Sequence, residues 1–172
     1  RNNTTSNRNN TTSSSTATSN RNNTTSSSSA SVATKPSHSS SSTTTSGTNA
    51  NGGSIVSRAY SQLGKPYVWG ACGPNSFDCS GFVSYCLTNS GVRNTGRLTA
   101  QGLYNICTPV SQSEAQPGDL IFFTGTYDAG VPVTHIGIYV GNGQMIHCGH
   151  PVQYTSINSP YWQSHFYGFG RW

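Results

Sequence analysis

The sequence is poor in acidic residues, with four Asp and Glu against nine Lys and Arg in 172 residues. The first 53 residues carry four of the basic residues and no acidic one, so the rest of the chain is nearly neutral. Because the excess charge lies on a Ser- and Thr-rich stretch, the composition does not indicate a nucleic-acid-binding groove. We expect no nucleic-acid partner.

Three further features are missing. The sequence has no Cys-x-x-Cys pair, which argues against a zinc knuckle, and we expect neither a metal nor a cofactor. No apolar run approaches the roughly 20 residues of a membrane-spanning helix, so no membrane insertion is expected. There is no initiator Met and no signal peptide, so we interpret the chain as a mature or excised C-terminal piece, with any export signal upstream of Arg1.

The first 53 residues also lack large apolar side chains, apart from Val32. The hexapeptide Arg-Asn-Asn-Thr-Thr-Ser occurs three times, starting at Arg1, Arg8 and Arg21. Three irregularly spaced copies do not make a repeat fold, and such a composition cannot bury enough apolar surface to fold. We predict a disordered linker over residues 1–53 and one small domain over residues 54–172.

Apolar periodicity and turn residues indicate the secondary structure of this domain. Ser54 is expected to cap the first helix, which places Ile55, Ala59 and Leu63 on one face. Helices are expected over residues 55–62, 79–89 and 99–106. Strands are expected over residues 119–123, 135–140, 144–148, 152–155 and 166–171. Helices followed by antiparallel strands predict an α+β domain.

Asp78 and Cys79 stand just ahead of an apolar run, where the second helix is expected to begin. Asp is a preferred N-cap residue, which places the thiol in the first helical turn. The helix dipole there favours thiolate over thiol. A lone cysteine is more often a buried structural residue, so a reactive thiol needs partners. The other cysteines can form two, one or no disulfides: Cys72, Cys86, Cys107 and Cys148.

Residues 141–143, Gly-Asn-Gly, are expected to turn a hairpin. With a three-residue loop the pairs are Val140 with Gln144, Ile138 with Ile146, and Ile136 with Cys148. These apolar side chains then share one face, whereas a two-residue Asn-Gly turn would mix His147 into it. We therefore prefer the three-residue loop. His135 and His147 then lie diagonally on the opposite face, with Cβ atoms about 7–8 Å apart.

A thiol beside two histidines is the arrangement that nucleophilic catalysis needs. We predict that Cys79 is the nucleophile, that His135 takes its proton, and that His147 holds His135 in the required tautomer and orientation. Either histidine alone is more often a satisfied or exposed residue. Two on one sheet face, together with a capped cysteine, favour the catalytic interpretation.

Four motifs occur in an order that is typical of one family of bacterial cell-wall cysteine peptidases. They are GKPYVWG at 64–70, FDCSGFV at 77–83, QPGDLIFF at 116–123, and HIGIYVGNG at 135–143 followed by Ile146-His147. On these motifs the chain resembles the NlpC/P60 family over residues 54–172. The chain departs from many members at Ala71-Cys72, where they have a second glycine. An insertion-like segment, 124–132, is expected to shape the cleft.

The resemblance implies a papain-like α+β fold, with the nucleophile helix packed on an antiparallel sheet. It implies the same three roles for the cysteine and the two histidines. It also implies that Tyr67, Asp78 and Ser80 line the pocket and bind the N-terminal side of the substrate. The Tyr67 hydroxyl is further expected to assist the oxyanion.

The substrate that the resemblance implies is the stem peptide of peptidoglycan, cut between γ-D-glutamyl and the diamino acid. We expect a monomer that is secreted or associated with the cell wall. Since a fold does not fix the bond that is cut, an amidase or another stem-peptide or cross-link endopeptidase stays open. A transglutaminase-like or acyltransferase activity is a further alternative. A non-catalytic wall-binding module is the alternative from a different class.

Overall fold

The computed structural model describes residues 49–172. The predicted linker therefore lies outside the described residues, except for residues 49–53, which belong to the folded domain. Asn49 donates its backbone N–H to Oε1 of Gln116 and its side-chain amide to Oδ1 of Asp119. The domain thus begins earlier than the sequence predicted.

Four α-helices and six strands make up this part of the chain. In order they are α1 (Gly52–Tyr60), α2 (Cys79–Asn89), α3 (Ala100–Ile106), β1 (Thr108–Val110), the 3-10 turn η1 (Gln112–Glu114), β2 (Leu120–Phe123), β3 (His135–Gly141), β4 (Gln144–Cys148), β5 (Val152–Ser156), α4 (Pro160–His165) and β6 (Phe166–Arg171). The sequence missed β1 and η1, because three residues are too few for any period, and α4, because six residues make less than two helical turns. Within residues 49–172, no helix is long and apolar enough to cross a membrane.

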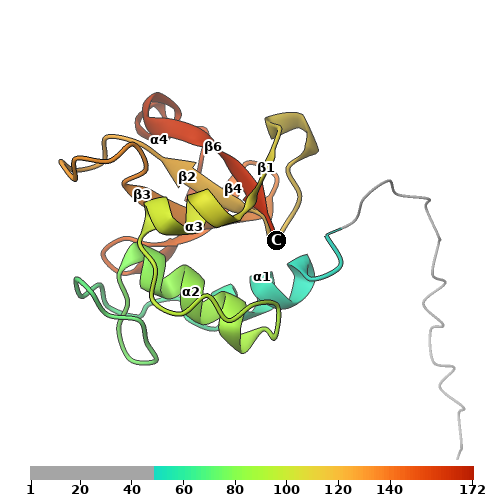
Figure 1. Ribbon diagram of the computed structural model, residues 1–172, viewed down its shortest axis with the longest axis vertical. Helices are drawn as coiled ribbons and strands as arrows, with labels where there is room; N and C mark the ends of the chain where they lie inside the picture. The colour runs from blue at the N-terminus through green and yellow to red at the C-terminus, as the bar shows by residue number, and fades with distance from the viewer. Residues whose placement is uncertain (1–48) are drawn as a thin grey trace, which may run out of the picture. The chain divides into compact units, whose positions relative to one another are not determined.

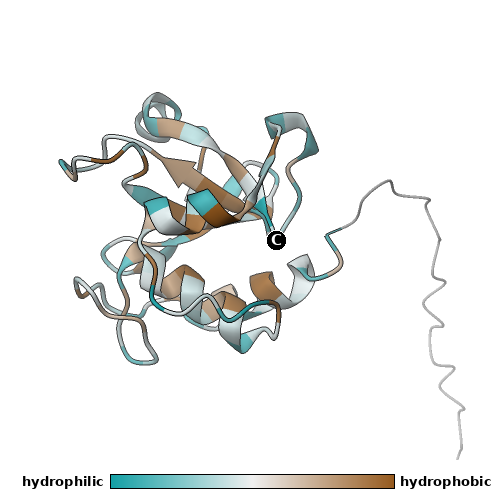
Figure 2. Ribbon diagram, in the orientation of Figure 1, coloured by the Kyte–Doolittle hydropathy of each residue, from teal (hydrophilic) through white to brown (hydrophobic). Residues whose placement is uncertain are grey.

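The six strands form one sheet in the order β1-β6-β2-β3-β4-β5, with every neighbouring pair antiparallel. Helices α1, α2 and α3 cover one face of it (Figure 1). Helix α2 is the most deeply placed, and both α2 and the central strands carry the brown of apolar residues in Figure 2. The core between them includes Phe82, Val83, Leu87, Leu120, Phe122, Ile136, Ile138 and Ile146. The predicted α+β class is confirmed.

The opposite face of the sheet is also covered. A second apolar cluster lies there, formed by Ile121, Phe123, Met145, Ile157 and Phe169. Helix α4 lies on this side, away from α1 and α2 (Figure 1), and its Trp162 packs against the cluster. The sheet face that carries the two histidines is therefore buried.

The first helix differs from the prediction at both ends. Asn51, not Ser54, occupies the N-cap position, and the Ser54 hydroxyl donates to the Asn51 carbonyl at 2.9 Å. Ile55 and Ala59 are buried as expected. Because α1 ends before Leu63, that side chain leaves the apolar face and is 41% exposed.

The hairpin of β3 and β4 has the predicted register but not the predicted turn. The central pair of isoleucines is as expected, whereas Gln144 pairs with Gly141 rather than with Val140. The turn is a two-residue Asn142-Gly143 turn with φ angles of 51° and 68°, as a type I′ turn requires. A bulge at Val140 adds one residue to β3 and restores the alternation. The rejection of a two-residue turn was therefore wrong, because the bulge compensates for it.

Candidate active site

Asp78 fixes the start of α2 at the N-cap position predicted for it. Its Oδ1 accepts the backbone N–H of Gly81 at 2.7 Å and the hydroxyl of Ser80 at 3.1 Å. Its Oδ2 accepts the backbone N–H of Gly70 at 2.9 Å and forms an ion pair with Arg97. Both carboxylate oxygens of Asp78 are thus bound by groups of the same chain. These bonds fix the next residue, Cys79, as the first residue of α2.

Gly81 lets α2 lie directly against the loop that precedes it. A Cβ at this position would be 2.1 Å from the carbonyl oxygen of Ala71. That same oxygen accepts the backbone N–H of Asp78 at 2.8 Å. Only a residue without Cβ permits this approach, which explains the glycine two positions after the cysteine.

The Cys79 thiol is buried and only 7% of the residue is exposed. Burial and, to a smaller extent, the neighbouring Asp78 carboxylate raise the pKa of Cys79 to about 11. The backbone N–H groups of Ser80 and Ile136 and the guanidinium of Arg97 lower the pKa, but by less. The predicted thiolate is therefore wrong for the resting protein, because loss of hydration outweighs the helix dipole.

His135 begins β3, next to Ile136, whose backbone N–H acts on the Cys79 sulfur. Its Nε2 lies 2.9 Å from Nδ1 of His147 on β4. The diagonal neighbourhood predicted from the hairpin register is confirmed. Gly137, which pairs with His147, provides the room, since a Cβ there would be 3.1 Å from the Cβ of His147.

A chain of hydrogen bonds runs from His135 through His147 to β5. Nε2 of His147 lies 3.1 Å from the Oγ1 of Thr155. A neutral imidazole has one donor and one acceptor nitrogen, so two tautomeric arrangements satisfy the chain. In one of them His135 donates from Nε2, and His147 donates from Nε2 to Thr155. Only this arrangement leaves Nδ1 of His135 unprotonated and able to accept a proton.

Both imidazoles are neutral at rest. Burial and, to a smaller extent, the neighbouring His147 together lower the pKa of His135 to about 3. Burial alone lowers the pKa of His147 to about 4. Because the Cys79 thiol is neutral as well, any reaction in which its sulfur attacks requires a base that removes the thiol proton.

A cavity of about 180 Å³ opens at the thiol. Its lining residues are Tyr67, Trp69, Asp78, Cys79, Ser80, Arg97, Thr99, Ala100 and Tyr127. The three residues predicted to bind substrate, Tyr67, Asp78 and Ser80, thus lie around one cavity with the cysteine. Burial, and then the nearby Cys79 and Asp78, raise the pKa of Tyr67 to about 12, so its phenol stays a hydrogen-bond donor.

Sequence reasoning missed three residues of this region. Arg97 comes from a loop that looked like a plain polar connection, and it bonds both Asp78 and Ser80. Thr155 and Trp162 come from segments with no motif, and both contact the histidine pair. No local signal marks them. All five cysteines are free thiols.

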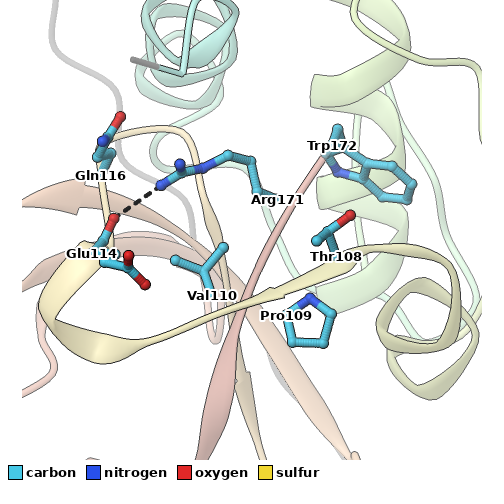
Figure 3. A pocket seen from close by; sticks show the side chains of 7 residues that line it. All are labelled: Thr108, Pro109, Val110, Glu114, Gln116, Arg171 and Trp172. Atoms are coloured by element: carbon cyan, nitrogen blue, oxygen red, sulfur yellow. Dashed lines mark hydrogen bonds between the residues drawn. The ribbon is translucent and has the colours of Figure 1, made fainter. Parts of the chain in front are cut away.

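A separate cavity of about 600 Å³ lies beside β1 and the end of β6 (Figure 3). It is lined by Thr108, Pro109, Val110, Glu114, Gln116, Arg171 and Trp172. Arg171 donates to the carbonyl oxygen of Glu114 at 2.9 Å and to both carboxylate oxygens of Asp119 at 2.7 Å. This lining contains neither thiol nor imidazole. Among the described residues, no group of three or more His, Cys, Asp or Glu side chains is arranged to hold a metal ion.

The comparisons with known proteins identify the family of the chain. Residues 64–171 match the NlpC/P60 family. The chain is 48% identical over 118 residues to the probable endopeptidase p60 of Listeria seeligeri. The aligned region covers 68% of this chain and 21% of that protein. The chain is also 41% identical over 120 residues to the bifunctional muramidase/DL-endopeptidase CwlT of Bacillus subtilis. That aligned region covers 69% of this chain and 36% of CwlT. The chain thus spans well under half the length of these two relatives.

A solved structure shows the same arrangement of helices and sheet. A lipoprotein-like member of the NLP/P60 family from Staphylococcus aureus is 38% identical, with a TM-score of 0.67. The match covers 74% of this chain and 43% of that one. The predicted α+β fold, with helix α2 packed on an antiparallel sheet, is confirmed.

Proposed function

Because the chain belongs to the NlpC/P60 family, we propose that residues 54–172 are a cysteine peptidase domain that hydrolyses the stem peptides of peptidoglycan. Two observations carry this proposal: the buried Cys79 thiol meets the backbone N–H of Ile136, and the preceding residue, His135, is hydrogen-bonded to His147. The relatives named as endopeptidases support the same class of reaction. We propose that the protein acts as a monomer in the cell wall or outside the cell.

Acylation starts from a neutral thiol. As the sulfur of Cys79 attacks the carbonyl carbon, its proton passes to Nδ1 of His135, the nitrogen that His147 does not occupy. The imidazolium that forms keeps its Nε2–H bonded to His147. His147 stays neutral, and through its bond to Thr155 it stabilises this charged form.

The oxyanion that forms on the substrate needs hydrogen-bond donors. The backbone N–H of Cys79, at the positive end of α2, is one candidate donor. The phenol of Tyr67 is the second, because its raised pKa keeps the O–H proton in place. Collapse of the intermediate breaks the C–N bond, and His135 gives its proton to the leaving amine.

Deacylation repeats these steps with water as the nucleophile. His135 removes a proton from the water, which attacks the thioester carbon. The C–S bond then breaks, the sulfur recovers the proton, and the carboxylic acid product leaves. The reaction is therefore a hydrolysis that consumes one water and needs no cofactor.

The acyl side of the substrate is proposed to bind in the 180 Å³ cavity. Asp78, Ser80 and Arg97 form a pre-assembled polar wall there, in which Arg97 Nη1 donates to the Ser80 hydroxyl at 2.8 Å. Such a wall suits the amide and charged groups of γ-D-glutamyl better than an apolar side chain. We therefore propose cleavage between γ-D-glutamyl and the diamino acid, which agrees with the name of one relative as a DL-endopeptidase.

The test is digestion of purified peptidoglycan of the diaminopimelate type and of the lysine type by the 172-residue chain. Mass spectrometry of the new ends identifies the bond. We expect new γ-D-glutamyl carboxylates and free α-amines on the diamino acid. Cleavage at the muramyl amide or at a cross-link instead would replace this assignment by the amidase or cross-link endopeptidase, and the absence of any new ends would favour a binding module.

A further inference from the structure

Trp162 of α4 contacts both imidazoles of the candidate site. Its indole stacks on His135, with ring centroids 5.4 Å apart and planes 27° apart. It meets His147 edge-on, with centroids 4.9 Å apart and planes 77° apart. Trp162 belongs to no sequence motif, and it comes from a helix that the sequence did not predict.

We propose that Trp162 is a positioning residue that fixes the plane of His135 and keeps water away from the hydrogen bond between His135 and His147. This inference rests on the proposed function for its effect on turnover. The effect of Trp162 on the hydrogen bond between His135 and His147 can be measured without substrate.

The first step of the argument is the rotation of the His135 ring. The terminal ring torsion of a histidine has a broad energy well, so a single hydrogen bond does not define the plane. A stacked indole on one side restricts this rotation, and Phe123 lies tilted against His135 with centroids 6.1 Å apart. Because the ring plane sets the direction of Nδ1, this packing aims the nitrogen that must receive the thiol proton.

The second step concerns water. A hydrogen bond in a dry environment is stronger than the same bond in contact with solvent. His147 is 2% exposed and His135 is 9% exposed. The large ring of Trp162 lies against both, so it accounts for much of this burial. Its removal would admit water that competes for the nitrogens of the pair.

The third step is that the position of Trp162 is itself well defined. Ser159 caps α4 by accepting the Trp162 backbone N–H at 3.4 Å. The side-chain amide of Gln163 donates to the Ile157 carbonyl at 2.8 Å. At the far end of α4, the carbonyl of His165 accepts the backbone N–H of Thr124 at 2.8 Å. These bonds tie the short helix to the sheet on both sides of the tryptophan.

Trp162 is more than a filler of the second apolar cluster. Aliphatic neighbours would suffice for a side chain that only fills space, whereas Trp162 packs on four aromatic rings. Besides the two imidazoles these are Phe123, with centroids 4.6 Å away, and Tyr161, with centroids 4.9 Å away. An aromatic partner on an imidazole adds a geometric preference that an aliphatic side chain does not.

The experiment compares Trp162→Ala with Trp162→Phe and with the control Tyr161→Ala. Tyr161 is the preceding aromatic residue of the same helix and is 49% exposed. Its ring stacks on His165 and meets Trp162 edge-on, with centroids 4.9 Å apart, so Tyr161→Ala controls for the loss of a ring beside Trp162 other than the two imidazoles. Two readouts are used with 15N-histidine-labelled protein: the downfield imidazole N–H resonance of the His135–His147 bond, and kcat and KM on a muropeptide.

We expect Trp162→Ala to lose the N–H resonance through exchange with water and to lower kcat by about 10- to 100-fold, since a misaimed group costs rates of this order. KM should change less than twofold. Trp162→Phe should retain the resonance and most of the turnover, and Tyr161→Ala should match the wild type. If Trp162→Ala does not fold, Trp162→Leu takes its place, because it keeps apolar volume without a ring.

A folded Trp162→Ala or Trp162→Leu variant with the wild-type resonance would overturn the proposal. So would a Trp162→Phe variant as impaired as Trp162→Ala. If the wild type cleaves no muropeptide at all, the proposed function fails, but the resonance still tests the positioning of the pair. The two failures are therefore distinguishable.

Discussion

Thr155 and His147 are joined by a hydrogen bond of 3.1 Å between Oγ1 and the ring Nε2. Thr155 lies on β5, at the edge of the sheet, and its hydroxyl is the last group of the chain that starts at His135. A hydroxyl can accept or donate, so it permits the tautomer of His147 that catalysis needs. The bond therefore gives a residue outside every motif a defined place in the proposed mechanism.

Thr155→Val should lower kcat by about tenfold with little change in KM. The variant keeps the shape of the side chain but removes the acceptor for His147, so the tautomer that leaves Nδ1 of His135 unprotonated is less favoured. General base catalysis as a whole contributes on the order of 10²–10⁴-fold, and only part of it is lost here. Steady-state kinetics on a muropeptide measure the effect. Thr155→Ser should retain activity, and a Thr155→Val variant within twofold of the wild type would contradict the assigned role.

The resting thiol should be unreactive at neutral pH in the absence of substrate. Because burial raises the pKa of Cys79 to about 11, the thiolate fraction should rise about tenfold per pH unit between pH 7 and 10. The rate of iodoacetamide labelling, followed at Cys79 by peptide mapping, should rise in parallel. A plateau of high reactivity between pH 5 and 8 would instead indicate a thiolate–imidazolium pair.

The protein should lose stability as the pH falls below about 6.5. In the unfolded chain a histidine takes up a proton near this pH, whereas burial lowers the pKa of His135 to about 3 and that of His147 to about 4 in the folded state. The unfolded state thus binds more protons, and each histidine costs up to about 1.4 kcal/mol per pH unit. Urea unfolding at pH 6.5 and pH 5 measures this slope. His147→Gln should reduce it, and a free energy of unfolding unchanged at pH 5 would refute the buried neutral pair.

Asp119 and Arg171 should carry a large share of the stability but none of the chemistry. The Asp119 side chain is 0% exposed and binds Arg171 through both oxygens. Arg171→Ala would leave a buried carboxylate without its cation, which costs about 3–5 kcal/mol. Urea unfolding should show this loss. The matched control is Glu114→Ala, an exposed acid whose side chain bonds only Ser111 among the described contacts, and it should shift stability by no more than about 0.5 kcal/mol. Equal losses in both variants would contradict the assignment.

Local sequence patterns predicted much of the fold and the pairing of the two histidines. The N-cap at Asp78 depends on one residue type ahead of an apolar run, and the structure has it. The histidine face depends on side-chain alternation along two adjacent strands, and His135 and His147 meet as the register predicts. The turn was assigned wrongly because a bulge at Val140 has no signature in the apolar pattern.

Properties that depend on distant packing were not accessible from the sequence. The thiol pKa was predicted in the wrong direction because burial of Cys79, the largest cause of its raised pKa, depends on tertiary packing. Trp162 and Thr155 reach the histidines from segments with no motif. Arg97 approaches Asp78 only through tertiary folding. Such contacts join residues far apart in the chain, where composition and spacing give no information.

The most direct test of the central claim is muropeptide hydrolysis by the Cys79→Ala variant, compared with the Cys72→Ala variant. Thermal unfolding of both variants shows whether they fold. Cys72 is an exposed free thiol in the loop that precedes α2, so Cys72→Ala controls for the loss of a sulfur atom. The account predicts that the Cys79 variant folds and releases no new γ-D-glutamyl ends, while the Cys72 variant cleaves at the wild-type rate. Cleavage by a folded Cys79→Ala protein would contradict it.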